Sequence, residues 1–125
     1  MNDTARSAYL DASIATASPA RLLVMLCDRL VLDVRRGLEA EVAGDPAGAN
    51  RHLLHAQDIV LELRASLRPD DFEGGHALDG VYEFLHAELV RANVSKDAAR
   101  ADGCLALAEQ LRDTWREAAM QAAVS

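Results

Sequence analysis

The sequence predicts an all-α protein, an antiparallel up-down-up-down four-helix bundle that follows a short, partly flexible N-terminal arm. Three observations predict this fold class. The chain has 125 residues, which is the size of one domain. Half of its residues are hydrophobic while only 4% are aromatic, and the apolar residues are mostly Leu, Ala and Val, a composition that suits helices better than sheets. Residues that favour turns divide the chain into an arm and four segments, each long enough for a helix.

The arm covers residues 1–17 and is polar except for Tyr9, Leu10, Ile14 and several alanines. Because it is short and only weakly amphipathic, we expect it to lie loosely over an apolar groove of the bundle, from which a partner displaces it. A frayed tail is the alternative, since chain termini are often poorly ordered.

Helix starts follow from capping residues and prolines. Ser18 offers a side-chain oxygen to an amide of the first turn, and Pro19 fixes φ there. Asp45 and Pro46 repeat this arrangement, and Asp97 caps the last helix. The bundle spans residues 18–122, with helices expected over about residues 19–42, 46–67, 76–92 and 97–122. Because the connections are short, consecutive helices must run antiparallel.

Each helical segment carries a stripe of apolar residues at spacings of three and four, the pattern of a helix with one buried face. The first two stripes comprise Leu23, Cys27, Leu30, Val34 and Leu38, and Leu53, Ala56, Val60, Leu63 and Leu67. The last two comprise Leu78, Val81, Tyr82, Leu85, Leu89 and Ala92, and Cys104, Ala108, Leu111, Trp115, Ala118 and Ala122. We expect the four stripes to meet in one core.

Two apolar pairs break this pattern. Met25 and Leu32 fall in the middle of the charged side of the first helix, and Leu54 and Leu61 widen the apolar face of the second. The members of each pair are seven residues apart, so they stack on successive turns, as a groove for an incoming amphipathic helix requires. We therefore expect Leu54 and Leu61 to be groove walls, and Met25 and Leu32 to form a second patch. The alternative is that they pack on the arm or lie singly in water.

The charge of the chain argues against nucleic acid as a partner. The formal net charge is −7, and no cluster of Lys or Arg is arranged to follow phosphates. The longest apolar run, residues 22–27, is far shorter than the roughly 20 residues of a membrane span. No charged and then apolar leader precedes it. We expect a cytoplasmic protein without membrane insertion.

The sequence gives no argument for catalysis, a metal or another cofactor. Glu83 and His86 form one Glu-x-x-His run, whereas di-iron bundle proteins carry two, and both residues point away from the core stripe. His55 lies on the polar stripe of the second helix and is expected to be solvated. Cys27 and Cys104 fall on core faces and are expected to be buried, reduced thiols.

A set of short motifs occurs along the chain in a particular order. It comprises Tyr9, Ile14, Thr16-Ala17-Ser18-Pro19, Leu22, Met25-Leu26-Cys27-Asp28, Ala56-Gln57-Asp58-Ile59, Ser66-Leu67, Tyr82-Glu83-Phe84, Arg91-Ala92-Asn93, Asp97 and Trp115. In this order the motifs resemble the flagellar secretion chaperone family usually called FliS, over nearly the whole chain. One departure is Cys27, which replaces a tyrosine common in the family, and this change within an apolar face is expected to leave the fold intact.

The resemblance implies a cytoplasmic export chaperone that binds the C-terminal segment of flagellin in hydrophobic grooves, prevents premature polymerisation and delivers it to the flagellar export apparatus. Tyr9 and Ile14 would belong to the displaceable cover of the groove. We expect a monomer or a weak homodimer. The alternatives are another helical-bundle adaptor or regulatory binding protein, and a metal-dependent bundle enzyme.

Overall fold

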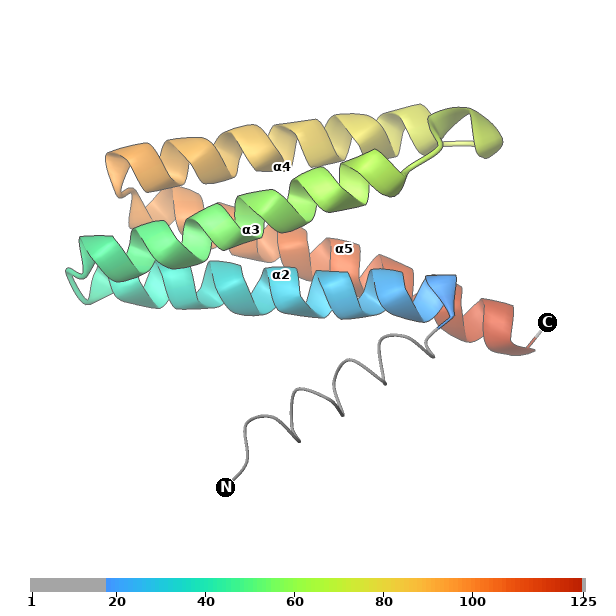
Figure 1. The fold of residues 1–125 in the computed structure, drawn as a ribbon, viewed down its shortest axis with the longest axis horizontal. Helices are drawn as coiled ribbons and strands as arrows, with labels where there is room; N and C mark the ends of the chain where they lie inside the picture. The colour runs from blue at the N-terminus through green and yellow to red at the C-terminus, as the bar shows by residue number, and fades with distance from the viewer. Residues whose placement is uncertain (1–17, 125) are drawn as a thin grey trace, which may run out of the picture.

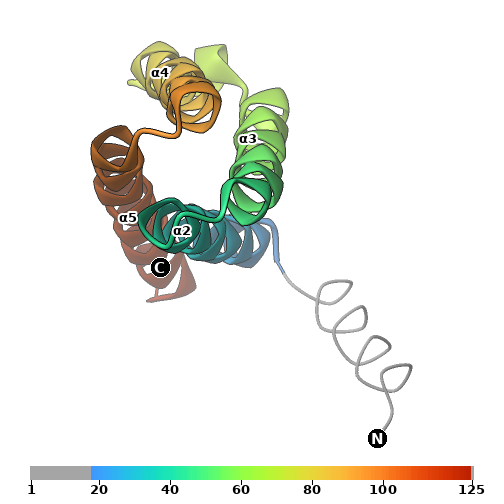
Figure 2. The same ribbon diagram turned by 90° about the vertical axis from the view of Figure 1, so that its left-hand side faces the viewer.

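The computed structural model describes residues 18–124, which form four α-helices and one short 3-10 helix without any strand. The elements are α2 (Pro19–Val42), α3 (Pro46–Ser66), η1 (Pro69–Asp71), α4 (Gly75–Ser95) and α5 (Ala98–Val124). Consecutive helices run in opposite directions (Figure 1), and the end-on view places them in a ring in chain order (Figure 2). The predicted all-α, up-down-up-down four-helix bundle is therefore confirmed. Tyr9 and Ile14 lie outside the described residues.

The helix starts depend on side-chain caps, as the sequence predicts. The Ser18 hydroxyl oxygen accepts a hydrogen bond from the backbone N–H of the third residue along at 3.2 Å, and Pro19 follows it. The Asp45 carboxylate accepts from the backbone N–H of Gly48 at 3.0 Å, and the Asp97 carboxylate from that of Arg100 at 3.1 Å. Each cap satisfies an amide of the first turn that has no partner within the helix, which fixes where the helix begins.

The third predicted helix is longer than expected. It was expected over about residues 76–92, but α4 continues through Asn93 and ends at Ser95, followed by the C-cap Lys96, whose φ of 52° lies in the left-handed region. Asn93 usually favours turns, yet here it is buried and its Nδ2 donates to Asn50 Oδ1 of α3 at 2.9 Å. This contact between helices gives the buried side chain of Asn93 a hydrogen-bond partner within the helical conformation.

The core lies where the four apolar stripes meet. Its largest fully buried side chains include Tyr82, Leu30, Leu53, Leu63, Leu85 and Leu89. Each such leucine stabilises the fold by about 1.5–3 kcal/mol relative to a water-exposed position. The predicted α5 stripe is wrong in its last two members, because Ala118 and Ala122 are exposed. The last turns of α5 extend beyond the start of α2 (Figure 1).

Asp33 is a buried charge within this apolar interior. Its side chain is fully buried, its Oδ1 lies 3.2 Å from Arg29 Nε one turn earlier, and its Oδ2 contacts His55 Nδ1 of α3. The expectation that His55 is merely solvated is therefore incomplete, since half of its side chain is exposed but the ring faces Asp33. A buried carboxylate needs such partners, and the three residues join α2 to α3.

Candidate functional site

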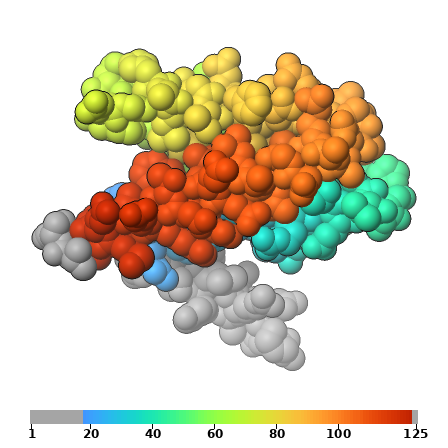
Figure 3. All heavy atoms as spheres, turned by 180° about the vertical axis from the view of Figure 1, so that it is seen from behind, coloured from blue at the N-terminus to red at the C-terminus, as the bar shows by residue number. Residues whose placement is uncertain are grey.

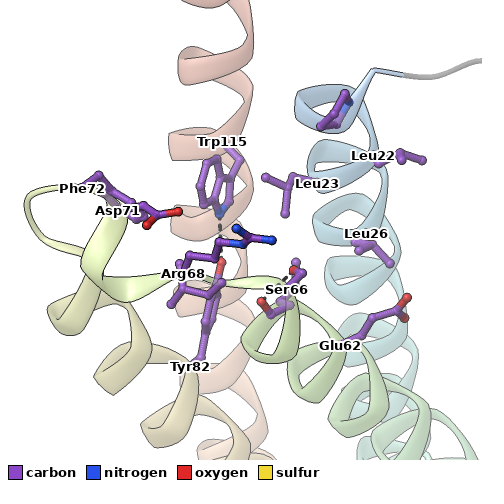
Figure 4. A pocket seen from close by; sticks show the side chains of 13 residues that line it. Leu22, Leu23, Leu26, Glu62, Ser66, Arg68, Asp71, Phe72, Tyr82 and Trp115 are labelled. Atoms are coloured by element: carbon purple, nitrogen blue, oxygen red, sulfur yellow. Dashed lines mark hydrogen bonds between the residues drawn. The ribbon is translucent and has the colours of Figure 1, made fainter.

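An apolar pocket of about 480 Å³ opens at one end of the bundle, where α2 begins and α3 ends (Figure 4). We call it the end pocket. Its walls are Pro19, Leu22, Leu23 and Leu26 of α2; Glu62, Leu63 and Ser66 of α3; Leu67, Arg68, Asp71 and Phe72 of the following loop; Tyr82 of α4; and Trp115 of α5. Nine of these thirteen residues are apolar or aromatic, so the pocket favours an apolar ligand surface.

Two aromatic side chains from different helices meet in the pocket. The indole Nε1–H of Trp115 donates to the phenol oxygen of Tyr82 at 3.1 Å, and the bond is drawn in Figure 4. Burial raises the pKa of Tyr82 to about 12, so its phenol is neutral at physiological pH. Because the polar ends of the rings satisfy each other, these two side chains offer mainly hydrocarbon to a ligand.

The local sequence explains why the pocket is open. The helical period brings Leu22 and Leu26 onto one side of the first turns of α2. Across from them α3 stops at Ser66, because Pro69 cannot continue a helix. The loop then turns away through η1, and Phe72 stays 45% exposed on its far side. No described helix fills the space between these segments.

A second apolar hollow continues the surface around the bundle. It is lined by Phe72, Leu78, Leu111, Thr114, Trp115 and Ala118, so it shares Phe72 and Trp115 with the end pocket. It lies between α4 and α5. In Figure 3 these two helices touch near the turn that joins them and diverge toward the C-terminal end of α5. The two hollows form one apolar strip that crosses several helices.

The predicted site residues lie elsewhere. Leu54 and Leu61 are 45% and 46% exposed on α3, while Met25 and Leu32 are half-buried on α2, and none of the four lines the end pocket. Leu61 shares a face of α3 with Arg64, whose guanidinium binds carboxylates of α4. The exposed leucines therefore face the α4 side of α3, and the structure does not bring them together with the α2 pair.

Sequence reasoning missed the end pocket itself. Leu22 and Leu26 belong to the apolar run at the start of α2 and to the family motifs, but neither pattern marked them as walls of a pocket. Phe72 is the clearest available signal, because it is an aromatic residue in a loop of charged residues and glycines. An aromatic side chain in such a loop indicates either a local anchor or a binding surface.

The remaining chemistry of the described residues is sparse. Burial raises the pKa of Cys27 and of Cys104 to about 12, so both thiols are protonated and unreactive at neutral pH. Among residues 18–124 no three His, Cys, Asp or Glu side chains are grouped so that they could hold a metal ion. No described helix is both long and apolar enough to span a membrane. The arrangement suits the binding of an apolar segment.

Comparison with known proteins identifies the family. The family model described as flagellar protein FliS matches residues 1–122. The chain belongs to the FliS family. The resemblance found in the sequence motifs is thereby confirmed.

Two curated FliS relatives support this assignment, and both are named flagellar secretion chaperone FliS. The protein from Bacillus subtilis (strain 168) is 28% identical over 112 residues, which cover 90% of this chain and 84% of the relative. The protein from Vibrio cholerae serotype O1 (strain ATCC 39315 / El Tor Inaba N16961) is 26% identical over 109 residues, with coverages of 85% and 79%.

The FliS assignment also agrees with the fold. A solved structure described as the crystal structure of a flagellar chaperone from bacteria covers 97% of this chain and 99% of its own, with a TM-score of 0.74. The two sequences are 20% identical, so this likeness concerns the fold.

Proposed function

We propose that this FliS-family protein is a cytoplasmic export chaperone. It binds the C-terminal segment of flagellin, prevents premature polymerisation of that segment and delivers it to the flagellar export apparatus. It acts by binding and not by catalysis. The observation that carries the proposal is the end pocket, an open apolar surface whose polar ring atoms are already satisfied. The names of the two curated relatives support the chaperone role.

The pocket suits a segment that folds as it binds. An amphipathic helix would place its apolar side chains against the leucines of α2 and the rings of Tyr82 and Trp115. Each leucine removed from water contributes about 1.5–3 kcal/mol, and the cost of ordering the segment offsets part of this gain. Several apolar side chains must therefore be buried together, which the strip shared with the second hollow allows.

Further surfaces belong to the proposed binding site. Leu54 and Leu61 supply an exposed apolar patch on α3, and Met25 with Leu32 a half-buried one on α2. A client that wraps around the bundle can contact these patches in addition to the end pocket.

The arm is the proposed cover of the end pocket. It joins the bundle next to Pro19, which is itself a wall of the pocket. A chain spans about 3.3–3.6 Å per residue when extended, so Tyr9 and Ile14 are within reach of the pocket. In this proposal they occupy apolar surface until the client displaces them.

The test is a titration with a peptide that corresponds to the C-terminal segment of the flagellin from the same organism. Leu22 lines the pocket, and Leu22→Glu is expected to weaken binding at least about tenfold, because it places a charge against the apolar ligand. The matched control is Val42→Glu, at the far end of the same helix, where Val42 is 74% exposed. Circular dichroism checks that both variants keep their helices. Equal affinity of wild type and Leu22→Glu would contradict the proposal.

A further inference from the structure

Charged side chains surround the apolar mouth of the end pocket. Glu62 of α3 and Asp71 of η1 supply two carboxylates, and Arg68 supplies the only cation among the lining residues. In Figure 4 the Arg68 guanidinium extends across the pocket toward the leucines of α2. The long aliphatic part of an arginine packs on apolar surface while its charged end stays accessible, so Arg68 is both a wall and a charge.

These charges differ from those between the helices, because the latter are paired. Arg64 pairs with Asp79 and Glu83, Arg100 with Glu88, and Arg116 with Asp28. Within residues 18–124 the side chains of Arg68, Glu62 and Asp71 form no hydrogen bond or ion pair. At the rim of the end pocket, apolar surface and unpaired charge therefore coincide.

The chemistry of guanidinium defines what it would recognise. It is charged at all physiological pH values and binds carboxylates through two parallel N–H groups. A chain with a formal net charge of −7 repels acidic partners in general, and an unpaired cation at the pocket opposes this repulsion locally.

We propose that Arg68 is a specificity-determining residue of the end pocket, where it pairs with a carboxylate on the bound segment. The proposal rests on the proposed function, so the segment is the flagellin C-terminal segment, bound as an amphipathic helix with an Asp or Glu beside its apolar stripe. Glu62 and Asp71 contribute to the same selection. A client carboxylate shifted away from Arg68 would meet one of these like charges, which disfavours other registers.

The experiment uses the single tryptophan of the chain, Trp115, as a fluorescent reporter in the pocket. The full chain and its Arg68→Glu variant are titrated with the flagellin C-terminal peptide at about 50 mM and about 300 mM NaCl, which changes the screening of surface charges. Arg68→Glu is expected to bind about tenfold more weakly at low salt, with a smaller difference at high salt. Arg68→Gln is expected to lose less affinity, because it removes the attraction without adding repulsion.

A matched control separates this local effect from the net charge. Arg51 is also exposed and on α3, but it lies away from the pocket and has no charged partner among the described residues. Arg51→Glu changes the net charge equally and is expected to bind within about twofold of wild type. Peptides in which each Asp or Glu is changed singly to Lys complete the test. One of them is expected to bind Arg68→Glu better than it binds wild type.

The outcomes distinguish this inference from the function on which it rests. A wild-type protein that does not bind the flagellin peptide overturns both. Wild type and Arg68→Glu that bind equally at low salt overturn the role of Arg68 and leave the chaperone proposal in place. Equal losses in Arg68→Glu and Arg51→Glu also overturn it, since the effect would then come from net charge. Circular dichroism of each variant verifies that these comparisons concern folded proteins.

Discussion

At the scale of single residues, the titratable groups in the core of residues 18–124 are either buried and neutral or in contact with a partner. The thiols of Cys27 and Cys104 and the phenol of Tyr82 are buried in the core, and burial raises the pKa of each to about 12. Asp33 is the buried charge, and it contacts Arg29 and His55. Because the interior has no reactive thiolate, Cys27 is best understood as a packing residue in place of the family's frequent tyrosine.

The buried thiols and phenol predict a loss of stability in alkaline solution. Their pKa values are raised from 9.0 for the thiols and 10.0 for the phenol, so the unfolded chain releases these protons at a lower pH than the folded chain does. The free energy of unfolding should therefore fall as the pH rises from about 9 toward about 12. Urea unfolding followed by circular dichroism at several pH values in this range measures the slope.

A substitution assigns part of this alkaline slope to one group. Cys27→Val keeps a buried side chain of similar size but removes one titrating thiol, so the slope should become shallower by up to about 1.4 kcal/mol per pH unit. An unchanged slope in Cys27→Val would show that the Cys27 thiol titrates alike in both states, contrary to its burial.

At the scale of helices and loops, local signals were predictable and contacts between elements were not. The starts of α2, α3 and α5 follow from caps that lie within three residues of the amides they satisfy, at Ser18, Asp45 and Asp97. The last turn of α4 contains the Asn93–Asn50 hydrogen bond, whose partners are 43 positions apart. No local pattern contains that information, so the helix was predicted three residues too short.

The candidate site also has a part that local sequence patterns predict and a part that depends on contacts between elements. Periodicity marked Leu54 and Leu61 as departures from a simple core stripe, and both are exposed. The end pocket depends instead on where the loop carries Phe72 and on how far Trp115 stands from the start of α2. These are tertiary positions, which a helical period does not encode.

The loop before α4 predicts an asymmetric response to two glycine substitutions. A Cβ on Gly75 would lie 2.1 Å from the carbonyl oxygen of Pro69, whereas one on Gly80 of the same helix would meet nothing within 4 Å. Gly75→Ala should therefore destabilise the protein by about 1–3 kcal/mol, since backbone must move. Gly80→Ala should be neutral or stabilising by up to about 1 kcal/mol, because alanine favours helices. Urea unfolding compares the two, and an equal effect would contradict the tight contact of the loop with α4.

The exposed face of α3 gives a separate prediction for client binding. If Leu54 and Leu61 are groove walls, Leu61→Glu should abolish retention of the flagellin C-terminal peptide in a pull-down, while helical content and cooperative melting are kept. Val94→Glu is a suitable control, because Val94 is 81% exposed on α4. Retention that survives in Leu61→Glu would restrict the binding surface to the end pocket and its neighbouring hollow.

At the scale of the whole molecule, the two ends of the bundle have different structures. At one end, short turns join α2 to α3 and α4 to α5, and Lys96 Nζ donates to Asn93 Oδ1 at 2.6 Å beside the Asn93–Asn50 hydrogen bond. At the other end the longer loop of residues 67–74, the first turns of α2 and the last turns of α5 separate around the end pocket. A partner can therefore enter at the pocket end without breaking the contacts between helices at the closed end.

This asymmetry predicts where client binding protects the backbone. A ligand that binds only the folded state stabilises it, by about 2.7 kcal/mol at a concentration of 100 times Kd, and local contacts should concentrate the effect near the ligand. Addition of the flagellin peptide should slow amide hydrogen exchange most in residues 19–26 and 63–72, which contain most of the pocket walls, and least in residues 42–46 at the closed end. Hydrogen exchange measured by mass spectrometry resolves these segments. In the Leu22→Glu variant, which serves as the reference, the peptide should no longer slow exchange in the segments around the pocket. Protection centred on residues 42–46 would show that the client binds the closed end, and the end pocket would then have to be given up as its site.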